Sequence, residues 1–240
     1  MNKKLEKLYE GKAKILYQTE NYEQLIQYFK DDATAFNNVK KDVISKKGIL
    51  NNYISEFLMK KLSENSIDNH FIKRISDREQ LIKAVNIIHL EIIIRNVTAG
   101  SMAKRLGIKE GLQLEKPIFE ICYKDDSLGD PLICDSHAIT VLKIIKEQEL
   151  QDIKKTSFKI NEILLALFDE IGIKLVDFKL EFGHDFRGKI ILSDEISPDS
   201  CRLWDKKSGE KLDKDIFRRD LGDLVTGYEK VAKALRVEPS

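Results

Sequence analysis

The run from Val176 to Phe182 constrains the fold of this 240-residue chain more than any other stretch, because apolar and charged side chains alternate along it without a break. Such a period of two is typical of a β-strand that turns one face to a hydrophobic core and the other face to solvent or ligands. The residues expected on the open face are Asp177, Lys179 and Glu181. The sequence therefore predicts a half-buried strand that carries two acids and a base side by side.

The residues after this strand predict a hairpin that gathers carboxylates. Gly183 is expected to end the strand, and a short turn leads into a returning strand that would bring Asp194 or Glu195 beside Glu181. One explanation is an ordinary solvated hairpin face. The other is a magnesium site, in which Glu181 and Asp194 hold the ion while Lys179 stands beside a nucleotide triphosphate.

The loop that follows the hairpin favours the second explanation. Pro198 fixes a turn, after which Asp199, Ser200 and Arg202 are offered from an irregular segment. Polar and charged groups on a loop that rigid strands hold in place are typical of the rim of an active site. We therefore expect this loop to contact a substrate.

A glycine followed by two lysines, Gly11 with Lys12 and Lys14, lies in a predicted hairpin over residues 8–17. Glycine permits a tight turn or a close approach of the backbone to a ligand, and the lysines could hold phosphates. The chain has neither of the two common glycine-rich nucleotide motifs. Taken alone, this segment is explained better as a solvated strand.

A second possible anion site combines Arg95 with Ser101. Arg95 ends a predicted buried strand over residues 86–96, and Ser101 is expected at the start of the helix that follows a glycine turn. An ordinary capped helix with a surface arginine explains the pattern as well. His89, within the same apolar run, is expected to be a core or hinge residue rather than a metal ligand, because no second histidine is near.

Charge and cysteine content narrow the function classes. Lysine and arginine number 41 and the acids 40, so the formal net charge of +1 provides no general attraction for nucleic acid or an anionic membrane. Cys122, Cys134 and Cys201 have the spacing of neither a disulfide framework nor a zinc site. No stretch is apolar and long enough for a signal peptide or a membrane span. We expect a cytoplasmic protein that has reduced thiols and binds neither nucleic acid nor membrane.

The remaining periodicity predicts a mixed chain with strands before about Val97 and helices and strands after it. The expected elements are a strand over 28–36 and helices over 49–62, 136–145, 147–171 and 213–235. No segment has the composition of a linker between two lobes. We therefore place the boundary between lobes near Arg95 from the change in predicted secondary structure alone.

Four motifs taken together resemble the SAICAR synthetase (phosphoribosylaminoimidazole-succinocarboxamide synthase) family. They are Tyr9–Lys14, Glu91–Asn96 with Ala99–Met102, Val176–Gly183 and Asp194–Asp205. The resemblance implies an ATP-dependent ligase of purine biosynthesis that joins carboxyaminoimidazole ribonucleotide (CAIR) and L-aspartate through an acyl phosphate. It also implies a homodimer with a two-lobed, kinase-like α+β fold: an antiparallel sheet in the ATP-binding lobe (1–95), a mixed α/β lobe for substrates and metal (96–240), and ATP in the cleft between them.

The same resemblance implies a role for each candidate site residue. The residues expected to bind ATP are Lys12, Lys14, His89 and Glu91. Those expected to bind CAIR are Arg95, Ser101, Asp199 and Arg202. The expected magnesium ligands are Glu181 and Asp194, with Lys179 as the group that neutralises charge on the transferred phosphoryl group. For L-aspartate only Asp130 and the loop over 32–38 are candidates, and no general base is apparent.

Two other function classes fit less well. A kinase would share the ATP site and the metal-binding acids, but the catalytic-loop and metal-binding motifs of protein kinases are absent from the sequence. An RNA-binding module would need a basic patch with interleaved aromatic residues, which the balanced charge argues against.

Overall fold

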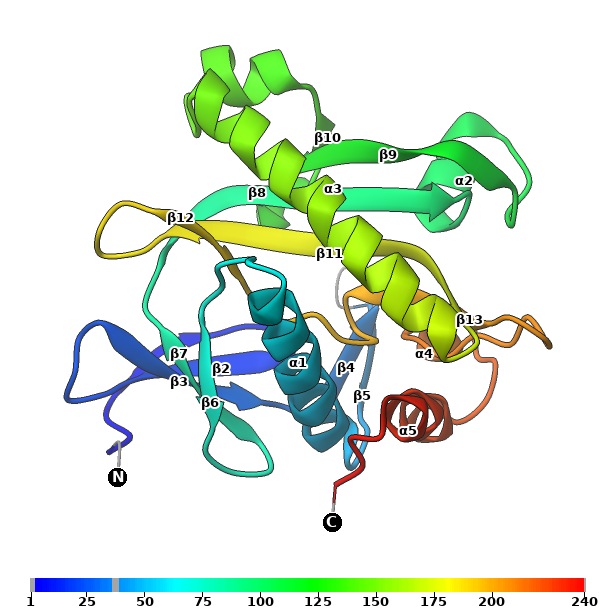
Figure 1. Ribbon diagram of the computed structural model, residues 1–240, viewed down its shortest axis with the longest axis horizontal. Coiled ribbons are helices and arrows are strands. Elements are labelled where there is room, and N and C mark those ends of the chain that lie inside the picture. Colours follow the sequence, from blue (N-terminus) through cyan, green and yellow to red (C-terminus); the bar gives the residue numbers. More distant parts are fainter. Residues whose placement is uncertain (1–2, 36–38, 240) are drawn as a thin grey trace.

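The computed structural model describes residues 3–35 and 39–239, which form antiparallel sheets flanked by helices (Figure 1). The first sheet has the strand order β1-β2-β3-β7-β6. Its strands are β1 (Lys7–Glu10), β2 (Lys14–Gln18), β3 (Gln24–Phe29), β6 (Phe71–Arg74) and β7 (Glu79–Lys83). A separate hairpin joins β4 (Asp32–Ala35) and β5 (Lys40–Val43). The N-terminal part of the chain is therefore strand-rich, as predicted.

The second sheet is built around β11 and has the strand order β10-β9-β8-β11-β12, with β13 also paired to β11. Its strands are β8 (Asn86–Val97), β9 (Gln113–Tyr123), β10 (Leu132–Ile133), β11 (Ile173–His184), β12 (Ile190–Ser193) and β13 (Cys201–Asp205). One edge of β11 pairs with β8, and the other pairs with β13 and then β12. The predicted strand over 176–182 is thus confirmed in the middle of a sheet.

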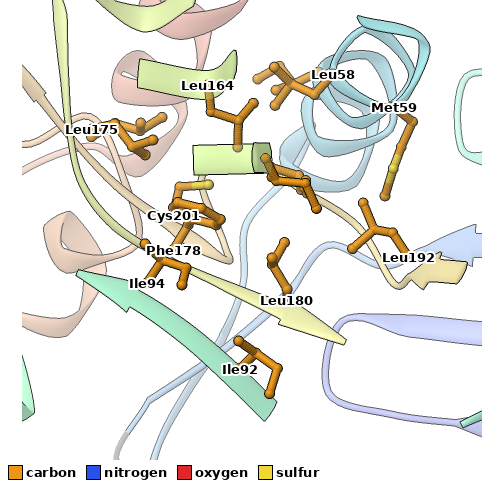
Figure 2. Packing of buried hydrophobic residues seen from close by; sticks show 14 of the residues in the cluster. Leu58, Met59, Ile92, Ile94, Leu164, Leu175, Phe178, Leu180, Leu192 and Cys201 are labelled. Carbon is orange, nitrogen blue, oxygen red and sulfur yellow. The ribbon is translucent and has the colours of Figure 1, made fainter. Parts of the chain in front are cut away.

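Two long helices contribute to the main hydrophobic core, one packed on this sheet and the other on the first sheet. α1 (Lys47–Glu64) and α3 (Glu147–Glu170) contribute to one core with β8 and β11. Figure 2 shows Leu58 of α1 near Leu164 of α3 and Met59 of α1 near Leu192 of β12, with Phe178 and Leu180 of β11 in the same cluster. The remaining helices are α2 (Gly100–Leu106), α4 (Asp215–Arg218), α5 (Leu224–Leu235), a 3₁₀ turn (Asp126–Leu128) and a π-helix (His137–Val141). The α+β class is as predicted.

The alternation along β11 holds, with two irregularities in its pairing, one before Asp177 and one between Glu181 and Gly183. Phe178, Leu180 and Phe182 belong to the main core. The pairing of β11 with β13 shifts by one residue between Leu175 and Asp177, and Val176 packs in a separate small cluster with Val97, Ala99 and Trp204. A β-bulge of this kind inserts one extra residue and locally re-aims the strand. It lies directly before Asp177, the first charged residue of the run.

Several predicted boundaries are wrong. Gly183 does not end the strand, which continues to His184. The single strand expected over 28–36 is two strands, β3 and β4, and Phe36 lies outside the described residues. The helix expected over 213–235 is α4 and α5, because Asp220 and Gly222 between them have positive φ values of 54° and 132°. The helix expected over 136–145 is shorter than predicted, because it consists of the π-helix (His137–Val141) and the two helical residues before it.

The chain passes from the first sheet to the second between β7 and β8, which are separated by only two residues. The lobe boundary near Arg95 stays a prediction. Among the described residues, no helix combines the length and the apolar character that crossing a bilayer requires.

Candidate active site

A row of three charged residues crosses three neighbouring strands. Asp177 of β11 stands opposite Arg95 of β8 and Arg202 of β13. Its carboxylate accepts hydrogen bonds from Arg95 Nη1 at 2.9 Å and from Arg202 Nη1 at 2.9 and 3.0 Å. Arg95 is 1% exposed, and a buried charge of this kind requires a paired and hydrogen-bonded partner. One carboxylate therefore holds two guanidinium groups at the same end of the sheet.

Further contacts fix both arginines. Arg95 donates from Nε to Glu120 at 2.6 Å and from Nη2 to the Ser101 hydroxyl oxygen at 3.1 Å. Arg202 donates from Nε to Asp215 Oδ2 at 3.0 Å. Burial alone would lower the pKa of Arg202, but Asp177 and Asp215 outweigh it and raise that pKa above the ordinary arginine value. Both guanidinium groups are thus held in fixed orientations.

A pocket of about 540 Å³ opens beside Arg202. Gly100 forms part of its wall, and its polar lining consists of Ser101, Lys104, Glu110, Arg202, Asp215, Arg218 and Arg219. Gly100 has a positive φ of 54°, and a Cβ added there would lie 2.3 Å from Arg202 Nη2, so only glycine lets the arginine lie this close to the backbone. The four basic side chains of the lining outnumber its two acids, so the pocket suits a phosphate or carboxylate group.

The Ser101 prediction is wrong in one detail. The N-cap of α2 is Ala99, without a side-chain cap, and Ser101 lies within the first turn of the helix. The hydroxyl group points instead to Arg95. Ser101 and Arg95 are nevertheless brought together, as the sequence suggested.

The charged face of β11 continues toward a second group of residues. Glu181 stands opposite Glu91 of β8, and two lysines offset the repulsion between these acids. Lys179 Nζ lies 2.7 Å from Glu91 Oε1, and Lys124 contacts the Glu181 carboxylate. Lys179 and Glu181 therefore share one face of the sheet, as predicted.

The turn after β12 carries Asp194 and Glu195, and Lys14 of β2 forms ion pairs with both. The predicted register was off by one residue, because Ser193 rather than either acid stands opposite Glu181. Asp194 has a positive φ of 66°, which is strained for a residue with a side chain. Burial, with Asp199 as a second cause, raises the pKa of the Asp194 carboxyl group to about 7. A positive charge in addition to that of Lys14 would therefore stabilise the ionised form of the Asp194 carboxyl group.

The donor set suits magnesium better than a tightly bound transition metal. Among the residues that the structure describes, no three histidine, cysteine or acidic side chains are grouped to hold a metal. Magnesium commonly takes only one or two protein carboxylates and completes its shell with water and substrate phosphates. Glu181 and Asp194, each now facing a lysine, fit that pattern.

Comparison with known proteins decides the family. A family model described as SAICAR synthetase matches residues 7–235. The chain belongs to the SAICAR synthetase family. A phosphoribosylaminoimidazole-succinocarboxamide synthase of Bacillus subtilis is 55% identical over 97% of this chain and 96% of its own length.

Solved structures of SAICAR synthetases share the fold. The enzyme of Ehrlichia chaffeensis has 50% sequence identity and a TM-score of 0.95, over 98% of this chain and 100% of that chain. A SAICAR synthetase in complex with ADP has 45% identity and a TM-score of 0.94, over 98% of this chain and 99% of that chain. As a member of this family the chain is a nucleotide-binding ligase of purine biosynthesis, the class that the motifs predicted.

The predicted ATP residues lie in different surroundings. Lys14 is half-buried at the acidic turn, whereas Lys12 is more exposed and pairs with Asp126 at 2.7 Å. His89 has an exposed side chain on β8, so the core placement expected from its apolar neighbours is wrong. Glu91, two residues further along the same strand, reaches Lys179. Lys14 and Glu91 are therefore the two that adjoin the acids of β11 and the turn.

Sequence reasoning missed Lys47 in this SAICAR synthetase. The α1 helix was interpreted as core alone, yet Lys47 in its first turn is fully buried and lies 2.5 Å from Asp199 Oδ2. Tyr228 of α5 donates to Asp199 Oδ1 at 2.6 Å. Burial would raise the pKa of Asp199, but Lys214 and Lys47 lower it below the ordinary value. A usable signal was present, because Lys47 shares the helical spacing of Leu50 and Ile54.

Lys124 and Arg218 were also missed. Lys124 contacts Glu181 from the end of β9, and Arg218 lines the anion pocket while donating to Asp215 at 2.6 Å. Neither stands in a pattern that singles it out in the sequence, since each has other charged residues directly after it on a turn or short helix. Their proximity to the site arises from the folding of the chain.

Proposed function

We propose that this chain joins CAIR and L-aspartate with hydrolysis of ATP, and so forms SAICAR, ADP and phosphate. Membership of the SAICAR synthetase family supports the reaction class. The observation that carries the proposal is the arrangement along β11, where Asp177 anchors the arginines of an anion pocket and Glu181 stands among acids and lysines suited to a magnesium nucleotide. Two sites on one strand suit a reaction between two anionic substrates.

The chemistry explains why the site needs both cations and carboxylates. A carboxylate is too poor an electrophile for an amine, so a CAIR carboxylate oxygen first attacks the γ-phosphorus of ATP, and the bond to the β,γ-bridging oxygen breaks to release ADP. The amine of aspartate then attacks the acyl carbon, phosphate departs, and the amine loses a proton. Because the reacting groups are anions, positioning and positive charge supply most of the catalysis.

We assign CAIR to the anion pocket beside Arg202. Arg95, Ser101 and Arg202 would hold its phosphate or carboxylate groups, and the planar guanidinium groups suit bidentate contacts. Asp199, which Lys47 and Tyr228 hold in place, would shape this side of the cleft. The proximity of Gly100 to Arg202 supports the assignment, because it brings backbone and cation together at one wall of the pocket.

We assign ATP and magnesium to the acidic turn and the first sheet. Lys12 and Lys14 would meet the phosphates, His89 and Glu91 would adjoin the adenine, and Glu181 and Asp194 would be the metal ligands. When bound there, magnesium would neutralise charge on the phosphate oxygens. Lys179 would face the transferred phosphoryl group once the nucleotide competes with Glu91 for its ammonium group. The ADP complex of the related SAICAR synthetase supports a nucleotide site in this fold.

The test of this function measures ADP and SAICAR release with each substrate left out in turn. We expect ADP release to require both CAIR and L-aspartate. Undiminished ADP release with CAIR alone would instead favour a kinase and contradict the ligase reaction. From the resemblance we further propose a cytoplasmic homodimer with no nucleic-acid or membrane partner, and a monomer in sedimentation at micromolar concentration would contradict the dimer.

A further inference from the structure

A carboxylate of the protein itself takes up part of the anion pocket. Glu110, in the connection between α2 and β9, lines this pocket together with Arg219, which directly follows α4. Its Oε1 accepts hydrogen bonds from the Gly100 backbone N–H at 2.8 Å and from Arg219 Nη2 at 2.6 Å, and its Oε2 accepts from Arg219 Nη1 at 2.8 Å. An arginine pocket would give the same contacts to an anionic ligand, because two parallel N–H bonds from a guanidinium group suit carboxylate and phosphate alike.

The pair of Glu110 and Arg219 lies at the rim of the pocket, within reach of solvent. The side chain of Glu110 is 33% exposed and that of Arg219 is 37% exposed. Arg219 lowers the pKa of Glu110 to about 2, so the pair is ionic at neutral pH. Ion pairs with this degree of exposure contribute little net stability, because water and salt screen them. A more highly charged anion that enters the pocket can therefore take the place of the Glu110 carboxylate at Arg219.

The backbone on both sides of Glu110 is fixed, so only its side chain would move. Thr98 Oγ1 donates to the Lys109 carbonyl oxygen at 2.7 Å and accepts from the Leu112 backbone N–H at 2.9 Å. The Gly111 backbone N–H donates to the Thr98 carbonyl oxygen at 2.8 Å, and Thr98 is 1% exposed. Release of Arg219 thus requires the rotation of one partly exposed side chain and no change of fold.

Arg219 has a second acid to hold it in the pocket. Its Nη2 lies 3.4 Å from Asp215 Oδ2, and its backbone N–H donates to the Asp215 carbonyl oxygen at 3.0 Å. The Asp215 carboxylate also accepts from Arg202 at 3.0 Å and from Arg218 at 2.6 Å. Three guanidinium groups therefore gather around one buried carboxylate at the wall of the pocket, which leaves positive charge for a ligand with several acceptor oxygens.

The position of this pair favours the phosphate of CAIR over its carboxylate. A carboxylate that attacks ATP must lie near the acids assigned to magnesium, Glu181 and Asp194. Among the residues that the structure describes, neither of these acids lines the pocket. A phosphate group carries a charge of about −1.5 to −2 at neutral pH and three acceptor oxygens. It therefore suits several guanidinium groups at once, whereas a single carboxylate already satisfies one of them.

We propose that Arg219 binds the phosphate group of CAIR, and that Glu110 competes with this phosphate for Arg219. The inference rests on the proposed function, which supplies a substrate with a ribose phosphate. The competition favours doubly charged ligands: a phosphate gains charge attraction when it displaces the carboxylate, whereas a singly charged ligand only exchanges one such group for another. Glu110 therefore contributes to the selectivity of the pocket, and Arg219 to its affinity.

Glu110→Gln and Arg219→Gln, alone and combined, test this competition. Glu110→Gln keeps an acceptor oxygen for Gly100 but removes the charge, so we expect the KM for CAIR to fall about twofold to fivefold, as loss of a surface ion pair would allow. Arg219→Gln should raise this KM about tenfold, as loss of a charge-assisted hydrogen bond would. In the Arg219→Gln background, Glu110→Gln should bring no further gain, because the two carboxylate and phosphate ligands no longer share a partner.

Two control variants separate the competition from a general effect of surface charge. Glu210 accepts from Lys230 with both oxygens at 2.7 Å and is an exposed acid outside the pocket, so Glu210→Gln should behave as the wild type does. Arg187→Gln, on an exposed turn, should do the same. The KM for ATP should stay close to that of the wild type in every variant.

Calorimetry with ribose 5-phosphate, which has the phosphate but no carboxylate, probes the same site without turnover. Its affinity should change in the same directions as that for CAIR. A higher KM for CAIR together with a lower unfolding temperature in Glu110→Gln would show that the carboxylate only holds the pocket together, and would overturn the inference. An equal gain from Glu110→Gln in both backgrounds, or an effect of Arg219→Gln on CAIR but not on ribose 5-phosphate, would overturn it as well. If ribose 5-phosphate binding follows these expectations but no SAICAR forms, the proposed function fails and the phosphate site at Arg219 stands.

Discussion

Asp177 stands opposite Arg95 in the pairing of β11 with β8, and its Oδ2 accepts a hydrogen bond from Arg95 Nη1 at 2.9 Å in a buried position. The same oxygen accepts from Arg202 Nη1 at 2.9 Å. Removing this charge would leave the buried guanidinium group of Arg95 and the partly buried one of Arg202 on either side of a neutral side chain. Glu120 would then be the remaining carboxylate partner of Arg95, and Asp215 that of Arg202.

We expect Asp177→Asn to lower the free energy of unfolding by about 3–5 kcal/mol, the usual cost of breaking a buried ion pair by removing one partner. Urea denaturation measures this change. Asp169→Asn, which removes an exposed acid that pairs with Lys206, should change the stability little. Equal stability of the Asp177 variant and the wild type would show that the two arginines do not need this counter-ion.

Arg202→Lys should weaken CAIR binding selectively. The substitution keeps the positive charge but loses the planar fork that can make two parallel hydrogen bonds, so we expect CAIR affinity to fall about tenfold to a hundredfold while ATP affinity changes little. Calorimetry with each ligand measures both affinities. Lys12→Ala should show the reverse selectivity, and Arg187→Lys on an exposed turn should alter neither. Weaker ATP binding with unchanged CAIR binding would reverse the division of the cleft.

Glu181→Gln should uncouple nucleotide binding from magnesium. The amide is a poorer ligand for a hard cation than the carboxylate, so the extra ATP affinity that magnesium gives the wild type should be largely lost. Titrations of ATP with and without magnesium measure the difference. The metal assignment to Glu181 would be wrong if both affinity and turnover of the variant matched those of the wild type.

The stability of the protein should depend on pH through His70. Burial, with Lys14 and Lys83 nearby, lowers the pKa of His70 from 6.5 to about 3. Between these values the unfolded chain binds the proton and the folded chain does not, so stability is present above pH 6.5 and is lost as the pH falls. From pH 7 to pH 5 we expect His70 to contribute a loss of about 2 kcal/mol.

Urea denaturation of the wild type and of His70→Gln at both pH values isolates this contribution. Glutamine does not titrate, so the stability of the variant should fall less between pH 7 and pH 5 than that of the wild type. Parallel losses in the two proteins would mean that His70 does not govern the pH dependence in this range.

The sequence predicted the elements whose patterns are local. The alternation along β11 and the apolar stripes of α1 and α3 depend on neighbouring residues only, and the structure confirms these elements. The hairpin register could not be obtained in this way, because the strand continues through Gly183 and the turn shifts by one residue. A one-residue change of register moves every side chain to the other face, which is why Ser193 rather than Asp194 meets Glu181.

The residues of the candidate site could be predicted only where a motif of the resembled family includes them. Resemblance named Arg95, Ser101, Asp199 and Arg202 together, and the structure places Arg95 in contact with Ser101. Lys47 escaped because its burial depends on α1 meeting Asp199 from a distant loop and α5 from the end of the chain. Helical spacing could place Lys47 on the buried face of α1, but it could not identify the distant acid that pairs with it.

The strand β11 fixes the distance between Asp177 and Glu181. Asp177 and Glu181 lie four residues apart on its charged face, a span of about 13 Å at the usual rise of a strand. Loops around the cleft can lengthen or change composition without altering that span, whereas one residue inserted into or deleted from this stretch would turn one end of it toward the hydrophobic core. The distance between the pocket beside Arg202 and the acids around Glu181 is thus set by the strand and not by the loops.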